Sequence, residues 1–291
     1  MDLLQIKKSE FNLGLDREYK FLQISDMHIS YCDELSSPLD ISDKERCNIQ
    51  WNKMKIQFAK DNDEFYDERY DIDSIVLLET LFAHAEKIDA DAIILSGDIM
   101  DRVTDSSIRY LKNLFAKAGM PVFYCLGNHE HFNENHDKIN QYDRLKDLTN
   151  SPEYVSVDYG DFELLIVDNN KPISIEQLNF LKDKIASDKK LILVEHKPLL
   201  LGEFGEKMLD KIGEYFFIGL DKDDDITKEY VNLIKENDSH FIAVLCGHIH
   251  SAREYKITEN LMQISTSSGL IGACREIIIK WGKNHETNSI S

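Results

Sequence analysis

The chain has 291 residues, of which 42% are hydrophobic and 30% are charged, a composition typical of a folded globular protein. Its 34 basic and 53 acidic residues give a net charge of −19, so the surface repels phosphate backbones and a long nucleic acid is an unfavourable partner. No apolar run approaches the roughly 20 residues of a membrane span, and residues 1–13 lack the apolar core of a signal peptide. Five cysteines without CxxC spacing argue against a disulfide framework, so we expect a cytoplasmic protein with buried thiols at Cys125 and Cys246.

Short apolar runs that suit buried strands recur along the chain. They lie at residues 19–25, 92–95, 122–126, 154–157, 162–167, 191–194, 241–245, 253–258, 261–265 and 275–280. Apolar residues at helical spacing predict helices between them, at residues 75–88, 104–118, 137–148, 174–186 and 226–236. The alternation of strands and helices predicts an α/β protein, with one domain over residues 1–282 and a polar tail over 283–291.

Two stretches resist assignment. Residues 30–72 are rich in acidic and aromatic residues and lack an apolar period, which is typical of a solvated surface excursion. The alternative is that 30–72 is an insertion that serves as a lid or specificity loop, because it follows the first of the apolar strands. Residues 202–225 show no clear pattern.

Polar side chains directly follow five of the predicted strands. They are Asp26 and His28, Asp98, Asn128 and His129, His196, and His248 and His250. In an extended segment residues i and i+2 point the same way, so Asp26 and His28 can face one site. Any one of these groups alone has a structural explanation, such as a helix cap. Together they predict a shared site, because ligands of open α/β sheets bind at the carboxyl ends of strands.

The donor types indicate which metal would bind. Nitrogen and oxygen donors without thiolates suit Mn, Fe or Zn rather than Ca. The donors exceed the ligand shell of one ion, which holds about four to six atoms. Two divalent transition-metal ions that share one bridging carboxylate fit the count.

The same residues stand in five sequence blocks. These are Asp26-Met27-His28, Gly97-Asp98-Ile99-Met100-Asp101, Gly127-Asn128-His129-Glu130, His196, and Gly247-His248-Ile249-His250. In their content and order they resemble the signature of the calcineurin-like metallophosphoesterase family, over roughly residues 19–280. The resemblance implies an α/β (α+β) fold in which a two-sheet β-sandwich is flanked by helices, with a dinuclear centre at the strand ends.

The resemblance also implies a role for each residue. Asp26, His28 and His250 would hold the first metal ion, Asn128, His196 and His248 the second, and Asp98 would bridge them. His129 would face the substrate as general acid, oriented by Asp101, and a hydroxide between the ions would be the nucleophile. Arg102 matches the phosphate-gripping arginine of the protein-phosphatase branch, but Val103 replaces the glycine that follows it there. Phosphate contact and a structural salt bridge are therefore both open for Arg102.

The implied activity is metal-dependent hydrolysis of a phosphoester. We expect a small phosphodiester or phosphomonoester, nucleotide-like in kind, because the net charge disfavours a polyanion. The alternatives are a phosphoprotein phosphatase or a nuclease of the same family, and a non-catalytic metal-bound scaffold, which the intact ligands and His129 disfavour. The oligomeric state and the native metal pair stay open.

Overall fold

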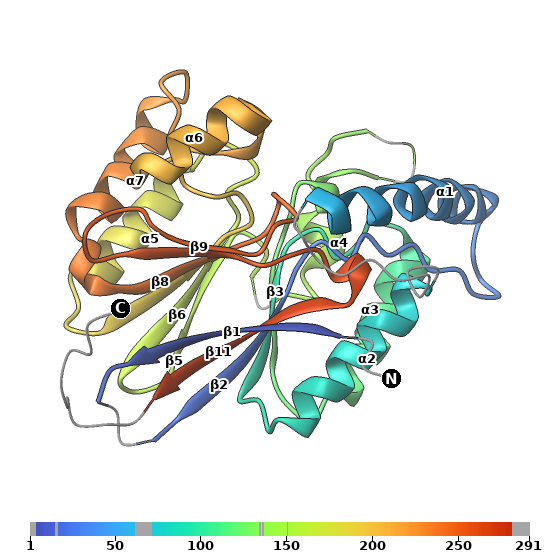
Figure 1. Cartoon of the computed structure of the whole chain (residues 1–291). Helices are drawn as coiled ribbons and strands as arrows, with labels where there is room; N and C mark the ends of the chain where they lie inside the picture. Colours follow the sequence, from blue (N-terminus) through green and yellow to red (C-terminus); the bar gives the residue numbers. More distant parts are fainter. Residues whose placement is uncertain are drawn as a thin grey trace.

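Two mixed β-sheets pack face to face, and helices cover their outer faces (Figure 1). The computed structural model describes residues 4–14, 17–61, 72–133, 135, 137–149 and 151–280. The five-stranded sheet has the order β1-β11-β2-β3-β4, and the six-stranded sheet has the order β5-β6-β7-β8-β10-β9. The strands are β1 (Gln5–Asn12), β2 (Tyr19–Ile24), β3 (Ala92–Ser96), β4 (Val122–Cys125), β5 (Tyr154–Asp158), β6 (Phe162–Val167), β7 (Lys190–Val194), β8 (Phe241–Cys246), β9 (Arg253–Lys256), β10 (Met262–Ser265) and β11 (Ala273–Lys280).

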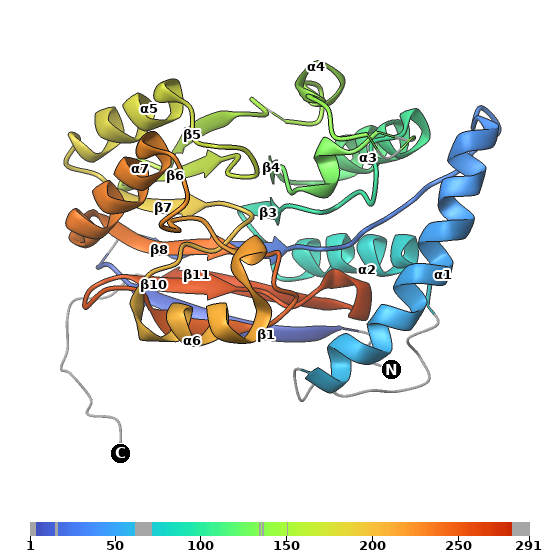
Figure 2. The same ribbon diagram turned by 90° about the horizontal axis from the view of Figure 1, so that it is seen from above.

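The helices fall on the two outer faces and above the strand ends (Figures 1 and 2). They are α1 (Pro38–Asp61), α2 (Ser74–Lys87), α3 (Asp105–Lys117), α4 (Tyr142–Leu145), α5 (Ile175–Ile185), α6 (Gly202–Ile212) and α7 (Asp225–Glu236). Helix α5 begins with the capping box of Ser174 and Gln177, which satisfies two otherwise unpaired backbone groups. The predicted two-sheet α/β sandwich is therefore confirmed.

Three apolar layers hold these elements together. Between the sheets, Phe21 and Ile94 of one sheet share a buried cluster with Leu164 and Ile192 of the other. A second cluster joins the five-stranded sheet to α2 and α3, and a third joins the six-stranded sheet to α5 and α7. Burial of one such side chain contributes about 1.5–3 kcal/mol. The apolar runs predicted strands that are buried on both faces, such as β3, β6 and β8, and also β5 and β9, which are only partly buried.

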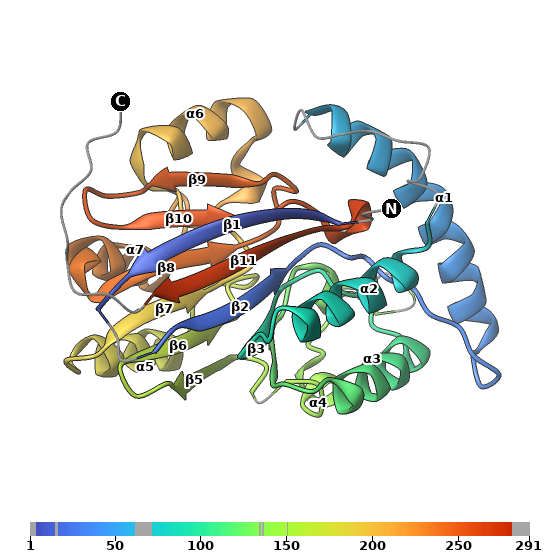
Figure 3. The same cartoon turned by 60° about the horizontal axis from the view of Figure 1, so that its bottom comes forward.

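Strand β1 is an element that the sequence reading did not predict. It pairs in parallel with β11 over its whole length, at the edge of the five-stranded sheet (Figure 3). Only Ser9 in β1 is buried, and its other side chains are partly or fully exposed. An edge strand of this kind carries no apolar run, because most of its side chains remain in contact with water.

Helix α1 is a second element that the sequence reading did not predict, and it lies within residues 30–72, which were read as a surface excursion or a lid. Its buried stripe is largely polar: Asp40, Asp43, Cys47, Trp51 and Lys55 are each at most 6% exposed. Apolar residues of α1 instead face outward, among them Ile49, which is 63% exposed. A helix that buries polar residues and exposes apolar ones lacks the apolar period on which a sequence prediction relies.

Two further helices depart from expectation. The helix predicted at residues 137–148 is reduced to α4, a single turn, and the unassigned stretch 202–225 contains α6 and the 3-10 helix η3 (Glu214–Phe216). The acidic residues at 62–71 and the predicted tail at 283–291 lie outside the described residues. Within the described parts of the chain, no helix combines the length and the apolar composition that crossing a bilayer requires.

Candidate metal centre

The loops that follow β2 and β3 lie side by side and carry three of the predicted donors. The backbone N–H of Asp26 donates to the carbonyl of Gly97 (2.9 Å), and that of His28 donates to the carbonyl of Asp98 (2.9 Å). These three donor residues have left-handed backbones, with φ of 54°, 43° and 53° for Asp26, His28 and Asp98. The two side chains of the first loop thus reach one site through left-handed turns, and not through the extended pleat that we predicted. Asp and His tolerate this conformation better than most residues, although it still costs free energy.

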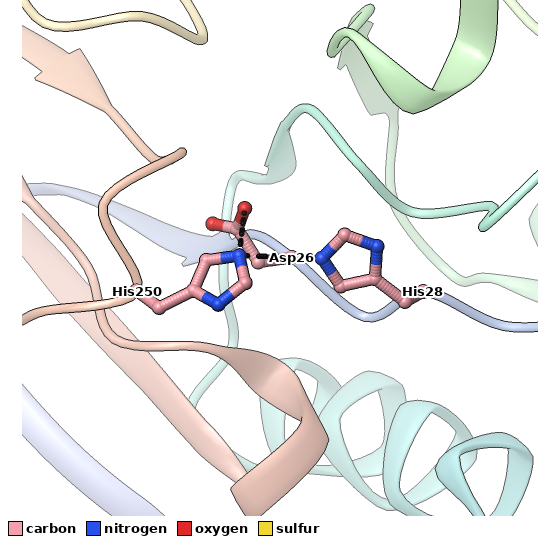
Figure 4. Close-up of side chains that lie close together, drawn as sticks. All are labelled: Asp26, His28 and His250. Carbon is pink, nitrogen blue, oxygen red and sulfur yellow. Dashed lines mark hydrogen bonds and ion pairs between the residues drawn. The ribbon is translucent and has the colours of Figure 1, made fainter. Parts of the chain in front are cut away.

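The first donor group joins the loop after β2 to the loop after β8. The Nε2 atom of His250 lies 3.0 Å from Oδ1 of Asp26 and 3.3 Å from Nε2 of His28, as Figure 4 shows. His250 and His248 also have left-handed backbones, with φ of 49° and 67°. Asp26, His28 and His250 therefore present three ligand atoms to one point.

The second donor group lies where the loops after β3, β7 and β8 meet. Oδ2 of Asp98 is 3.1 Å from Nε2 of His196, and this nitrogen is 3.1 Å from Nδ1 of His248. The other ring nitrogen of His196 contacts the carbonyl of Ser96 at 2.8 Å, which holds the ring with Nε2 toward the site. Asp98 also lies within ligand distance of His28, so it stands between the two groups.

Close backbone approach makes glycine necessary beside the donors. A Cβ atom on Gly97 would overlap the ring of His196, and one on Gly127 would overlap the carboxylate of Asp98. Glu130 then ties the two loops together, since its carboxylate accepts the backbone N–H groups of Asp98 (2.9 Å) and Gly127 (2.6 Å). Glu130 is fully buried, and burial raises its pKa. Glu130, which belongs to the block Gly127-Asn128-His129-Glu130, therefore fixes the loop after β3 against the loop after β4.

Neighbouring imidazole rings favour the ionised form of the carboxylates of Asp26 and Asp98. Burial raises the pKa of Asp26, but the adjacent ring of His250 outweighs that effect and lowers the pKa to about 2. Burial acts in the same direction on Asp98, and the ring of His196 again outweighs it, which leaves the pKa of Asp98 well below its usual range. Two buried negative charges at one site require a cationic partner.

The imidazoles fall into two classes. Burial and the neighbouring ring of His129 lower the pKa of His28 to about 3, and burial with the ring of His196 holds the pKa of His248 well below its usual range. His196 differs: burial lowers its pKa, but Asp98 outweighs burial and raises the pKa to about 9. A metal ion beside Asp98 would take the place of that proton, because metal binding and protonation compete for the same nitrogen.

The donor set fits divalent metal ions. Ligand atoms that bind one ion at about 2.1 Å and at right angles lie about 3.0 Å apart. The separations between neighbouring donor atoms, from 3.0 to 3.3 Å, are close to this value. Oδ1 of Asn128 is buried and has no hydrogen-bond partner among the described residues. Because buried polar atoms normally have a partner, this oxygen is available to bind a metal ion.

His129 lies beside the donors and is 21% exposed at the side chain. Its Nδ1 is 2.9 Å from the carbonyl of Asp101 and 3.3 Å from Oδ1 of the same residue. Burial lowers the pKa of His129, but the carboxylates of Asp98 and Asp101 outweigh it and raise the pKa to about 10. The contact between His129 and Asp101 that the sequence predicted is present, and it leaves the second ring nitrogen, Nε2, on the side of the ring away from Asp101.

Helix α1 supplies two residues that the sequence reading missed. The indole Nε1 of Trp51 donates to Oδ1 of Asp101 (2.7 Å), and the guanidinium of Arg46 donates to Oδ2. The indole also stacks on the ring of His28, with 3.8 Å between ring centroids and 18° between planes. The one signal available in the sequence was a tryptophan and an arginine five residues apart within an acidic stretch.

Arg102 does not line the site. Its Nη1 lies 2.9 Å from Oδ1 of Asp43 on α1, and Arg46 pairs with the same oxygen at 2.8 Å. Arg102 therefore forms the salt bridge that was one of its two expected roles, and it is not among the residues that line the adjacent cavity.

A cavity of about 560 Å³ opens over the donors. Its lining includes the side chains of His28, Asp98, Asn128, His129, His248 and His250. Trp51 of α1 and Tyr215 and Phe216 of η3 line it as well. The ring of Phe216 lies 5.0 Å from that of His248, so aromatic side chains flank both donor groups.

Comparisons with known proteins agree with this geometry. The family model described as calcineurin-like phosphoesterase matches residues 19–252. A curated protein of Fibrobacter succinogenes named "Probable cyclic nucleotide phosphodiesterase" is 23% identical over 210 residues, which are 67% of this chain and 76% of the relative. The crystal structure of a dimetal phosphatase from Danio rerio superposes with a TM-score of 0.54 at 13% identity, over 88% of this chain and 89% of the other. With the family match over most of its length and a donor set that fits divalent metal ions, the chain belongs to the calcineurin-like phosphoesterase family, whose members are hydrolases that act on phosphoester bonds.

Proposed function

We propose that this chain hydrolyses a small phosphoester, with a phosphodiester favoured, at a dinuclear metal centre. The observation that carries the proposal is the pair of donor groups, linked by Asp98, on the floor of one cavity that also contains His129. In this assignment Asp26, His28 and His250 would hold one ion, Asn128, His196 and His248 would hold the other, and Asp98 would be shared between them. When bound, the ions supply positive charge to the phosphoryl oxygens and lower the pKa of a water molecule that acts as nucleophile.

His129 has the position of a general acid. Its Nδ1 faces the backbone carbonyl of Asp101 at 2.9 Å, which orients the ring and leaves the proton on Nε2 for the leaving oxygen. The carboxylates of Asp98 and Asp101 favour the protonated ring, as an acid requires. An alkoxide leaving group needs such a proton, since it is a strong base.

The size and charge of the molecule favour a small substrate. The cavity of about 560 Å³ falls within the range of small-molecule sites, which is about 300–1,000 Å³. The net charge of −19 opposes a polyanion such as DNA, whose affinity depends on many basic contacts. The relative named for cyclic nucleotides makes these diesters the first compounds to assay.

The test is a comparison of kcat/KM under one metal condition. The substrates are bis-nitrophenyl phosphate, nitrophenyl phosphate, cyclic nucleotides, single-stranded DNA and a phosphopeptide. We expect a diester of small size to have the highest value. A lead of more than about tenfold for DNA or the phosphopeptide, about 1.4 kcal/mol of transition-state preference, would contradict the proposal. Absence of hydrolysis across the set after metal loading would favour the non-catalytic scaffold.

Metal content is the second expected result. Protein that has been stripped with a chelator and reloaded with Mn²⁺ or Zn²⁺ should bind two ions per chain, because two donor groups converge and Asp98 belongs to both assignments. Elemental analysis after gel filtration measures the stoichiometry. A value that stays near zero or one after loading would refute the dinuclear centre.

The third expected result concerns Trp51, which we assign as a positioning residue. Trp51→Phe keeps an aromatic ring over His28 but removes the indole N–H that binds Asp101. We expect kcat to fall by about 10- to 100-fold with little change in KM, because outer-shell hydrogen bonds of metal sites have effects of this size. The loss should be smaller for substrates with good leaving groups, since Asp101 orients the acid. Lys53→Ala, an exposed position on the same helix, is the control. A loss that is independent of the leaving group would assign Trp51 a structural role only.

A further inference from the structure

Two cations line the cavity without any carboxylate partner among the described residues. They are Lys211 of α6 and Arg253 of β9. The other arginines that the structure describes each form an ion pair with Asp or Glu: Arg17, Arg46, Arg102, Arg109, Arg144 and Arg275. In a chain with 53 acidic residues, an arginine that stands unpaired at a cavity is the exception.

The position of these cations matters for what binds there. Arg253 follows the donor His250 by three residues, and α6, which carries Lys211, packs against β9. Both cations therefore lie beside a centre that becomes more positive when metal ions bind. With no carboxylate partner among the described residues, these two cations are available to bind an anionic group of a ligand in the cavity. In the proposed function the phosphoryl group under attack would lie at the metal donors, which leaves these two cations for a different group of the ligand.

The lining of the cavity is also partly apolar and aromatic. Met208 and Ile212 of α6 line it together with Tyr215. Tyr215 is 59% exposed, and its ring lies 5.4 Å from that of His248. An exposed aromatic ring at a cavity can pack against a flat organic group of a ligand.

We propose that the substrate carries a second anionic group, a phosphate or a carboxylate, which Arg253 and Lys211 bind while its organic part packs against Tyr215. This inference rests on the proposed phosphodiesterase function and narrows its substrate class to esters with at least one charge beyond the reacting phosphate. Arg253 supplies a planar donor pair that matches a phosphate or carboxylate, and Lys211 supplies a point charge. A nucleotide diester with a further phosphate is one compound of this class.

A matched pair of esters tests the inference. One is the 4-nitrophenyl ester of thymidine 5′-phosphate, and the other is the same compound with a 3′-phosphate. Both have the same reacting diester, the same leaving group and the same base, so the ratio of their kcat/KM values reports only the added anion. The metal-loaded protein should prefer the 3′-phosphorylated ester by at least about tenfold, the size expected of a charge-assisted hydrogen-bond pair.

Variants show which of the two cations produces the preference for the 3′-phosphorylated ester. Arg253→Gln should bring the ratio close to one, Lys211→Gln should lower it less, and Arg253→Lys should keep part of it. Lys256→Gln is the matched control, because it removes a cation from an exposed position of the same strand that does not line the cavity. Since each ratio is measured within one variant, partial loss of folded protein does not change it.

The outcomes are separable. Equal kcat/KM for the two esters in the unmodified protein, or a preference that survives Arg253→Gln unchanged, would overturn the inference and leave the proposed function standing. Failure to release nitrophenolate from either ester would overturn the proposed function and this inference with it.

Discussion

Replacing Asp98 with alanine is expected to lower kcat/KM by at least about 10³-fold and to reduce the metal content of the protein. Asp98 lies 3.1 Å from His196, and its carboxylate also forms a cluster of ligand atoms with His28 and His129, so it stands between the two donor groups. Its Oδ1 also accepts the backbone N–H of His129 at 2.8 Å, which places the acid. Loss of a ligand shared by two ions removes several kcal/mol of charge stabilisation, and about 4 kcal/mol corresponds to about 10³ in rate.

Metal analysis and kinetics measured on the same samples check this expectation. Asp98→Asn keeps the shape of the side chain and removes its charge, so it separates loss of a ligand charge from collapse of the loop. Asp168→Asn is the matched control, because Asp168 is also a buried aspartate just after a strand but bonds to His131 and Tyr142. It should lower stability and retain two ions. An Asp98→Ala protein with both ions and full activity would show that Asp98 does not bridge.

Replacing His129 with alanine is expected to leave metal binding intact and to lower kcat by about 10²–10⁴-fold, the range that loss of a general acid produces. The defect should shrink for nitrophenyl esters, because nitrophenolate leaves without protonation, and grow for alkyl esters. A series of diesters whose leaving groups have increasing pKa measures how the loss of kcat depends on the leaving group. Asp101→Asn should give a milder defect of the same kind, because the backbone carbonyl of Asp101 still holds Nδ1.

The dependence of the kcat loss on the leaving-group pKa separates two roles for His129. If His129→Ala loses the same factor for every leaving group, the residue positions the substrate and is not the acid. If the variant loses metal ions, His129 is a ligand, which is a geometric possibility because its ring lies within ligand distance of His28 and Asp98. Elemental analysis of the variant before the kinetic series settles the second point.

The sequence by itself predicted the sandwich and the edge at which the site lies. Apolar runs such as 92–95 and 241–245 became strands buried on both faces, because such a run is stable only where both faces are covered. Strands β2, β3 and β4 are parallel neighbours in one sheet and β7 and β8 are parallel neighbours in the other, so the donors that follow each set share one edge of that sheet. The packing of the two sheets brings these two edges together, so that Asp26 after β2 and His250 after β8 lie 3.0 Å apart.

Other features depended on contacts between elements distant in the chain. Strand β1 forms because β11 offers it an edge, and its own side chains carry no apolar pattern. The two donors after β2 converge through left-handed turns that hydrogen bonds to the loop after β3 hold in place, and periodicity does not encode such turns.

Helix α1 depended most on its tertiary contacts. Its buried face is polar because Arg46 and Trp51 bond to Asp101, and Asp43 bonds to Arg102. Buried polar groups are stable only with such partners, and the partners Asp101 and Arg102 lie 50 or more residues away in sequence. The sequence determined which side chains could hold metal ions, because strand ends and donor types are local properties. Only the tertiary structure decided which helix closes over them, because the pairing of buried polar groups is a property of the folded chain.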